Sequence, residues 1–209
     1  RSSELRRRVL SALVLGALVL AATWFGGWFY RGLWIAVAGL AAYEWFGMVS
    51  RRNAVPAGVG VALAGLALGA APVSLAAIAG TAAFFGLLAA LIVPFQERRA
   101  VLEGCGVAYA LVFALVPPAL RSLDGIGLAL TLWSFAVVWC TDIGAYFVGR
   151  AFGGPKLMPR VSPKKTWSGA IGGTGAGVAA GAALLVLTTP IGWTAGLLVS
   201  VIASVVSQA

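Results

Sequence analysis

The interval from Asp142 to Gly173 holds the residues of this sequence that are best suited to chemistry. It reads DIGAYFVGRAFGGPKLMPRVSPKKTWSGAIGG and lies between two long apolar runs. One acidic and five basic side chains fall within it: Asp142, Arg150, Lys156, Arg160, Lys164 and Lys165. Guanidinium and ammonium groups are the usual protein partners of phosphate. A membrane protein with this cluster is therefore expected to hold a strongly anionic ligand, such as a phosphate, at the membrane surface.

Prolines recur every four residues between the two apolar runs, at Pro155, Pro159 and Pro163. They prevent a continuous helix and favour an extended, stiffened path. Such a loop can display its cations around an anion, with hydroxyl donors from Ser162 and Thr166. Ser162 is also expected to cap a helix that begins at Pro163, whose positive end would face a phosphate. The alternative is an ordinary basic loop that touches anionic lipid headgroups.

Asp142 is an ionisable group within an apolar run, where charged side chains are costly and usually face a cavity or the protein interior. It precedes Arg150 by about 12 Å along a helix axis. We expect it to bind a metal ion or to orient the basic loop; the alternative is a structural ion pair with a loop cation. Glu44 is a second such acid, which either pairs with Arg51 or Arg52 or lines a polar cavity.

The composition identifies the class of protein. Of 209 residues, 61% are hydrophobic and 10% charged, and the mean hydropathy is +0.98. The chain has no histidine, which excludes histidine bases, nucleophiles and metal ligands. Cys105 and Cys140 lie in apolar surroundings and indicate neither a disulfide framework nor a metal site. The net charge of +9 is typical of the positive-inside rule in such a chain, and we expect no nucleic-acid partner.

These features predict an all-α, polytopic integral membrane protein with about eight transmembrane helices. The expected spans are 9–27, 32–49, 55–70, 73–94, 101–118, 126–148, 169–188 and 192–209. We expect two regions, 1–125 with about five spans and 126–209 with the catalytic region and its basic loop, 149–168. With the N-terminus inside, 13 of the 15 basic residues fall on the inner side. The loop is therefore expected to be cytoplasmic.

Four glycines, Gly169, Gly173, Gly177 and Gly181, recur at four-residue spacing in the seventh expected span. This spacing favours close helix packing, either within one chain or between two chains of a homodimer. The segment GGTGAG does not indicate a dinucleotide site, because no strand precedes it.

The chain resembles the phosphatidate cytidylyltransferase family, also called CDP-diacylglycerol synthases. The similarity lies in D-x-G-A-Y-F-x-G-R-x-F-G from Asp142 to Gly153, in K-L-x-P-R-x-S-P-K-K-T-W from Lys156 to Trp167, and in the glycines ending at Gly173. The YEW element at residues 43–45 is a weaker match. Ser168 departs from the family pattern, which commonly has Glu there.

The family's C-terminal signature, rich in Lys, Asp, Gly and His, does not occur before Ala209. The resemblance implies that this segment is missing from the fragment or absent from the protein. In the first case part of the metal site is missing too, and we expect the 209 residues alone to be inactive.

The resemblance implies an enzyme that uses CTP and phosphatidate to make CDP-diacylglycerol and pyrophosphate, with membrane lipids around it, in a bacterial-type inner membrane. It implies Mg²⁺ as cofactor, with a second cation left open. The expected catalytic residues are Lys164, Lys165 and Arg160, and the expected metal ligand is Asp142. The expected substrate-binding residues are Ser162, Thr166, Lys156, Arg150 and Trp167.

Three alternatives stay open. The first is another CTP-dependent lipid enzyme, a CDP-archaeol synthase or a polyprenol kinase. The second is a transporter, which would spread polar residues through several spans; the third, fourth and eighth expected spans are almost free of them. The third is a non-enzymatic scaffold that binds anionic lipid.

Overall fold

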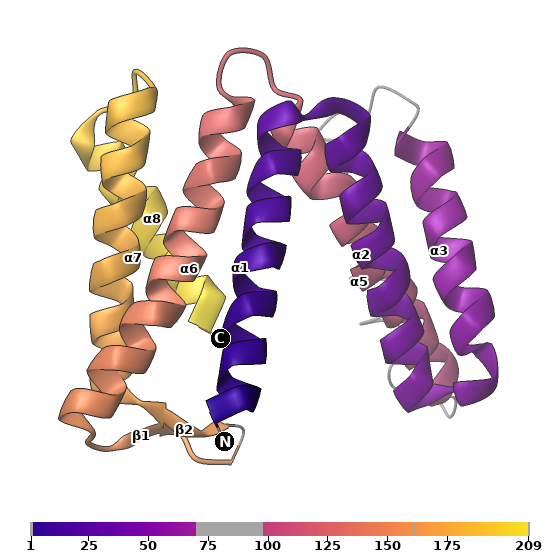
Figure 1. Cartoon of the computed structure of the whole chain (residues 1–209), viewed down its shortest axis with the longest axis horizontal. Helices are drawn as coiled ribbons and strands as arrows, with labels where there is room; N and C mark the ends of the chain where they lie inside the picture. The colour runs from indigo at the N-terminus through magenta and orange to yellow at the C-terminus, as the bar shows by residue number, and fades with distance from the viewer. Residues whose placement is uncertain (1, 70–97, 161, 209) are drawn as a thin grey trace. The chain divides into compact units, whose positions relative to one another are not determined.

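The computed structural model describes residues 2–69, 98–160 and 162–208. Most of these residues are helical, and the chain divides into two compact units, Arg1–Leu123 and Asp124–Ala209 (Figure 1). Each unit has its own helical packing and is described by itself.

The first unit contains helices α1 (Ser2–Phe25), α2 (Gly27–Val49), α3 (Ala54–Gly69) and α5 (Arg98–Arg121), with a short 3₁₀ turn η1 (Arg51–Asn53) before α3. Helix α2 packs against both α3 and α5. Small side chains dominate the contact, and the buried core consists of Ala38, Ala42, Val61, Ala110 and Ala114. Small residues let helix backbones approach closely, which is how helices associate where lipid removes the hydrophobic drive.

Polar groups secure the ends of this first unit. Arg121, at the end of α5, donates to the carbonyl oxygen of Thr23 at 2.8 Å and thereby caps the end of α1.

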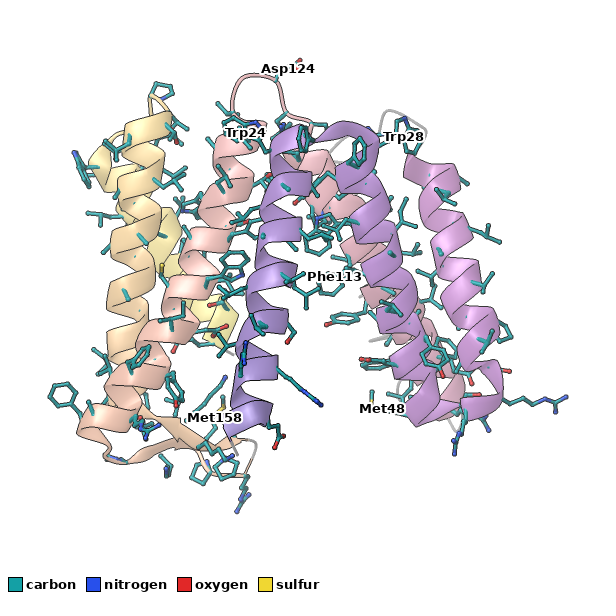
Figure 2. The ribbon with its side chains drawn as sticks, viewed as in Figure 1. Trp24, Trp28, Met48, Phe113, Asp124 and Met158 are labelled. Atoms are coloured by element: carbon teal, nitrogen blue, oxygen red, sulfur yellow. The ribbon has the colours of Figure 1, made fainter. Side chains whose placement is uncertain are left out.

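Figure 2 places Trp24 and Trp28 at one end of the helices and Met48 at the opposite end of α2. Both tryptophans are exposed, as expected for aromatic residues at a membrane interface.

The second unit contains α6 (Gly127–Phe152), the strands β1 (Lys156–Met158) and β2 (Ser162–Thr166), and the helices α7 (Trp167–Thr188) and α8 (Trp193–Gln208). The strands form an antiparallel hairpin in which Lys156 pairs with Thr166 and Met158 with Ser162. Gly153 and Gly154 have φ of 60° and 102°. These left-handed values are accessible to glycine and let the chain turn sharply from α6 into β1.

The glycine spacing of α7 matches a carbonyl spacing on α6. A Cβ atom added at Gly169, Gly173 or Gly177 would lie 2.6–2.8 Å from the carbonyl oxygens of Ala145, Thr141 and Val137, in that order. The two helices are therefore antiparallel and in close backbone contact. The glycines pack within one chain, which was one of the two expected alternatives.

Helix α8 joins this pair through buried hydroxyl groups. The Ser204 hydroxyl shares a hydrogen bond with Thr141 at 2.7 Å, and Trp133 donates to Ser200 at 2.9 Å. Ser200, Ser204 and Thr141 are fully buried. The expectation that this last span carries almost no polar side chains was wrong. The span contains Thr194, Ser200, Ser204, Ser207 and Gln208, and Ser200 and Ser204 are buried against α6.

The prediction of a helical membrane protein is confirmed in its coarse form. Within the described residues, five helices are long and apolar enough to cross a membrane: α2, η1 with α3, α5, α6 and α7. Two shorter apolar helices cover Val9–Phe25 and Trp193–Gln208. The expected span 73–94 lies outside the described residues, so the number eight stays a prediction.

Two local predictions were wrong. Ser162 does not cap a helix, because residues 162–166 pair with β1 as a strand; Thr166 caps α7 instead. The prolines keep this segment out of a helix, and pairing between the two strands supplies the backbone hydrogen bonds that a helix would have supplied. The hairpin is therefore an exception to the expected all-α class. Arg150 lies in the last turn of α6, so the loop begins at Gly153 and not at residue 149.

Candidate functional site

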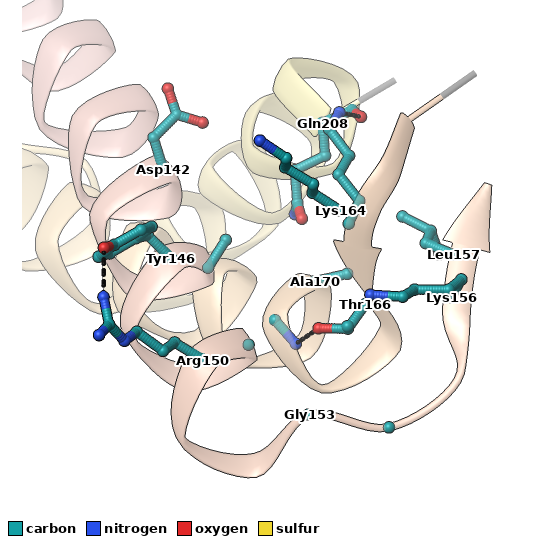
Figure 3. Close-up of a pocket in the computed structure, with 15 residues that line it drawn as sticks. Asp142, Tyr146, Arg150, Gly153, Lys156, Leu157, Lys164, Thr166, Ala170 and Gln208 are labelled. Atoms are coloured by element: carbon teal, nitrogen blue, oxygen red, sulfur yellow. Dashed lines mark hydrogen bonds between the residues drawn. The ribbon is translucent and has the colours of Figure 1, made fainter. Parts of the chain in front are cut away.

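A cavity of about 480 Å³ opens where α6 ends and the hairpin begins (Figure 3). Its walls come from the last turns of α6, both strands, the first turn of α7 and the end of α8. The charged residues that line it are Asp142, Arg150, Lys156, Lys164 and Lys165. Among the described residues, four cations and one carboxylate therefore surround this pocket, which favours a polyanionic ligand.

The cations reach this pocket because the hairpin folds back over the end of α6. Lys156 lies on β1, opposite Thr166 of β2, while Lys164 and Lys165 precede that threonine. Lys165 donates to the carbonyl oxygen of Gln208 at 2.6 Å, at the negative end of α8. Arg150 donates to the Tyr146 hydroxyl at 3.0 Å, one helical turn earlier on α6.

The first turn of α7 is held by the hairpin and lines the cavity. The Thr166 side chain accepts from the backbone N–H of Gly169 at 3.2 Å, as an N-cap does. The N–H of Trp167 donates to the carbonyl of Pro155 at 3.1 Å. Gly169 and Ala170 line the cavity beside the capped turn. A helix N-terminus placed there adds to the attraction for phosphate.

Ser168 occupies the position where the resembling family commonly carries Glu. Its hydroxyl donates to the carbonyl oxygen of Gly153 and lies 3.2 Å from the Thr166 hydroxyl. The serine thus links the glycine turn after α6 to the start of α7.

Asp142 faces the cavity from α6, about two turns before Arg150, and its side chain is exposed. It makes no ion pair with any residue that the structure describes. The alternative of a structural ion pair with a loop cation is therefore not observed. The carboxylate remains accessible to a cation or to a ligand in the pocket.

Glu44, the other acid within a span, does not pair with Arg51 or Arg52. All three side chains are exposed, and the ion pair that the structure records in this part of the chain joins Arg99 to Glu103 at 3.3 Å. Glu44 does not line the cavity of the second unit.

The structure brings together most of the predicted site residues and separates others from them. Asp142, Arg150, Lys156, Lys164, Lys165 and Thr166 share the cavity. Arg160 and Ser162 do not line it, since they lie at and just after the turn of the hairpin. Trp167 lines a neighbouring apolar cavity.

Among the described residues of the wall, two with polar side chains were missed by the sequence reasoning, Tyr146 and Gln208. The Gln208 amide nitrogen donates to the Thr174 hydroxyl at 2.9 Å, which binds the end of α8 to α7. The spacing of Ser200, Ser204 and Gln208 is four residues, so all three lie on one helix face. This four-residue spacing was the sequence signal that could have indicated that Gln208 faces the other helices; no such signal was available for Tyr146.

No group of three or more metal-binding side chains occurs within the described part of the chain. Asp142 alone cannot enclose a metal ion. Mg²⁺, however, is commonly held by one or two carboxylates together with substrate phosphates and water. One accessible carboxylate beside a cationic pocket fits that mode of binding.

Comparison with known proteins assigns this arrangement to a family. A model of the cytidylyltransferase family matches residues 6–209. A phosphatidate cytidylyltransferase of Brucella suis biovar 1 (strain 1330) is 39% identical over 211 residues, which cover 99% of this chain and 77% of the relative. No solved structure matches the chain.

Other relatives carry the same name. A phosphatidate cytidylyltransferase of Pseudomonas aeruginosa is 34% identical over 193 residues, covering 81% of this chain and 66% of the relative. One from Haemophilus influenzae is 62% identical over 47 residues, or 22% of this chain and 16% of the relative.

Proposed function

The chain belongs to the cytidylyltransferase family, and we propose that it transfers a cytidylyl group from CTP to phosphatidate, giving CDP-diacylglycerol and pyrophosphate. The observation that carries this proposal is the cavity of four cations and one carboxylate at the end of α6. It combines a polyanion site with a membrane-embedded helical frame. Both substrates require that combination, because one comes from water and the other from lipid.

In this reaction an oxygen of the lipid phosphate attacks the α-phosphorus of CTP. A new P–O bond forms, the bond from the α-phosphorus to the bridging oxygen breaks, and pyrophosphate leaves with its electrons. The attacking oxygen is already anionic near neutral pH, so no strong base is needed. A site without histidine is therefore suited to this chemistry. The main difficulty is to bring two polyanions together and to stabilise the leaving group.

The cavity residues can meet that difficulty with fixed positive charge. Lys164 and Lys165 extend from β2, Lys156 from β1 and Arg150 from α6, so cations approach a bound triphosphate from several elements. The capped N-terminus of α7 contributes its dipole to the same space. These groups neutralise phosphate oxygens and orient the two reacting groups toward each other.

Asp142 is the described residue that would hold Mg²⁺ at this site. When bound with the nucleotide, the ion supplies Lewis-acid stabilisation of charge on the phosphate oxygens. The carboxylate would also fix the position of the triphosphate relative to α6. Charge placement in the sequence supports eight spans with the cavity mouth on the cytoplasmic side. The bacterial relatives favour an inner membrane as its location.

The test uses the complete protein in lipid nanodiscs, with radiolabelled CTP and phosphatidate. We expect Asp142→Asn and Lys165→Ala each to lower kcat/KM by about 100-fold or more, comparable to the loss of one preorganised charge contact. Chelation of divalent cations should abolish turnover, and added Mg²⁺ should restore it. Membrane insertion should be unchanged.

Arg160→Ala is the matched control, because it removes a cation from the same hairpin but outside the cavity. We expect it to keep most of the activity. Near-normal activity of Asp142→Asn and Lys165→Ala would refute the assignment of the site. Turnover of an archaeol or polyprenol substrate in place of phosphatidate would refute the assignment of the substrate.

A further inference from the structure

A second cavity, of about 590 Å³, adjoins the cationic one in the second unit. It lies between β1, the first turns of α7 and the end of α8. Its lining is Leu157, Met158, Trp167, Ala170, Ile171, Thr174, Val205 and Gln208. No charged residue occurs among the described residues of this lining, and Trp167, Ile171 and Val205 leave more than half of their surface exposed. We call it the apolar groove.

The two cavities are neighbours that share one wall. Leu157, Ala170 and Gln208 line both of them. Gln208 is held in this wall by its hydrogen bond to Thr174 and by the bond that its carbonyl accepts from Lys165. One side of the shared wall therefore faces lysines and Asp142, and the other faces aliphatic and aromatic side chains.

This arrangement restricts the occupant. A ligand that fills both cavities needs an anionic group joined to a hydrocarbon chain within a few atoms. CTP has no hydrocarbon chain for the groove, and a bulk lipid without a phosphomonoester has less charge for the lysines. The ligand that satisfies both cavities is a lipid with a phosphate headgroup.

We propose that the apolar groove binds one acyl chain of the phosphatidate whose phosphate lies in the cationic cavity, and that the shared wall aligns the two ends of the lipid. This inference rests on the proposed function. An acyl chain that moves from bilayer to groove gains little hydrophobic free energy, since lipid tails are as apolar as leucine. The groove therefore acts through shape, and it determines which acyl chains place the phosphate correctly.

A bulky residue in the groove tests this role. Val205→Trp should fill the groove from α8, while Val206→Trp adds the same bulk to the next residue, which is exposed and outside the lining. In the complete protein, we expect Val205→Trp to raise the KM for dioleoyl phosphatidate by about 10-fold, as clashes in an apolar pocket do. The KM for CTP and turnover of dihexanoyl phosphatidate should stay within twofold of wild type. Val206→Trp should change none of these values.

A photolabel provides a readout that does not depend on turnover. Phosphatidate with a diazirine in its acyl chain should crosslink to residues 167–174 of α7 or to residue 205 of α8, and unlabelled phosphatidate should compete. Equal KM values for Val205→Trp and Val206→Trp, or crosslinks confined to other helices, would overturn the inference. Failure of the wild-type protein to use phosphatidate would instead overturn the proposed function, whatever the crosslinks show.

Discussion

Replacing Gly173 by alanine tests whether the close contact of α6 and α7 positions the site. A Cβ atom at Gly173 would lie 2.6 Å from the carbonyl oxygen of Thr141 and 2.8 Å from the Cβ of Ala145. Ordinary contact begins at 3.4 Å, so the helices must separate by about 0.8 Å near this point. The displaced backbone is the one that carries Asp142, the residue that follows Thr141.

The magnitude follows from this displacement. Inserting a methyl group into a packed contact costs about 1–3 kcal/mol of stability. A shift of about 1 Å in the position of a catalytic group can cost about 100-fold in rate. We therefore expect Gly173→Ala to lower kcat/KM for cytidylyl transfer by about 10- to 100-fold and to lower the thermal midpoint in detergent micelles.

Gly175→Ala is the matched control on the same helix. Gly175 is exposed, and an added Cβ meets nothing within 4 Å. Alanine there should be neutral or stabilise the helix by up to about 1 kcal/mol, with normal activity. The reasoning is refuted if the two alanine variants show the same activity and the same thermal midpoint.

Two further predictions concern the supports of the site. Thr166→Val removes the cap of α7 and should cost about 1 kcal/mol of stability, measured by thermal unfolding, with reduced activity. Thr166→Ser keeps a capping hydroxyl and should retain stability and activity. A loss in the serine variant equal to that in the valine variant would contradict the capping role. Thr141→Val and Ser204→Ala should each destabilise the protein. The double variant should be more stable than the sum of the single effects by about 0.6 kcal/mol, the average for such bonds in membranes, whereas strict additivity would mean that the hydroxyls do not interact.

Much of the helical frame was predictable because apolar length and composition dictate membrane helices. The expected spans 101–118, 126–148 and 169–188 each differ from α5, α6 and α7 by at most four residues at either end. A long apolar segment in lipid must satisfy its backbone internally, and a helix does so with local hydrogen bonds alone. The local sequence, through the length and composition of its apolar segments, is therefore enough to predict this part of the fold.

The hairpin shows where local reasoning is insufficient. The prolines correctly indicated an extended path between α6 and α7, but they did not indicate pairing of β1 with β2. Ser162 and Pro163 form a common helix-start signal, yet Thr166 caps the helix. Strand pairing depends on the partner segment across the turn, and that partner is not visible in a local motif.

The sequence by itself determined the chemistry that this chain can offer. Its apolar runs specify membrane helices, and the Asp142–Gly173 interval specifies one carboxylate with a cluster of cations. Those properties follow from residue types and local spacing. The tertiary structure decided which of these residues share a cavity: the hairpin directs Lys156, Lys164 and Lys165 inward while Arg160 stays outside. It also placed Gln208 of α8 in the cavity wall, although this residue is far in sequence from α6 and the hairpin. The position of α8 depends on contacts between segments far apart in the chain, which local sequence does not reveal.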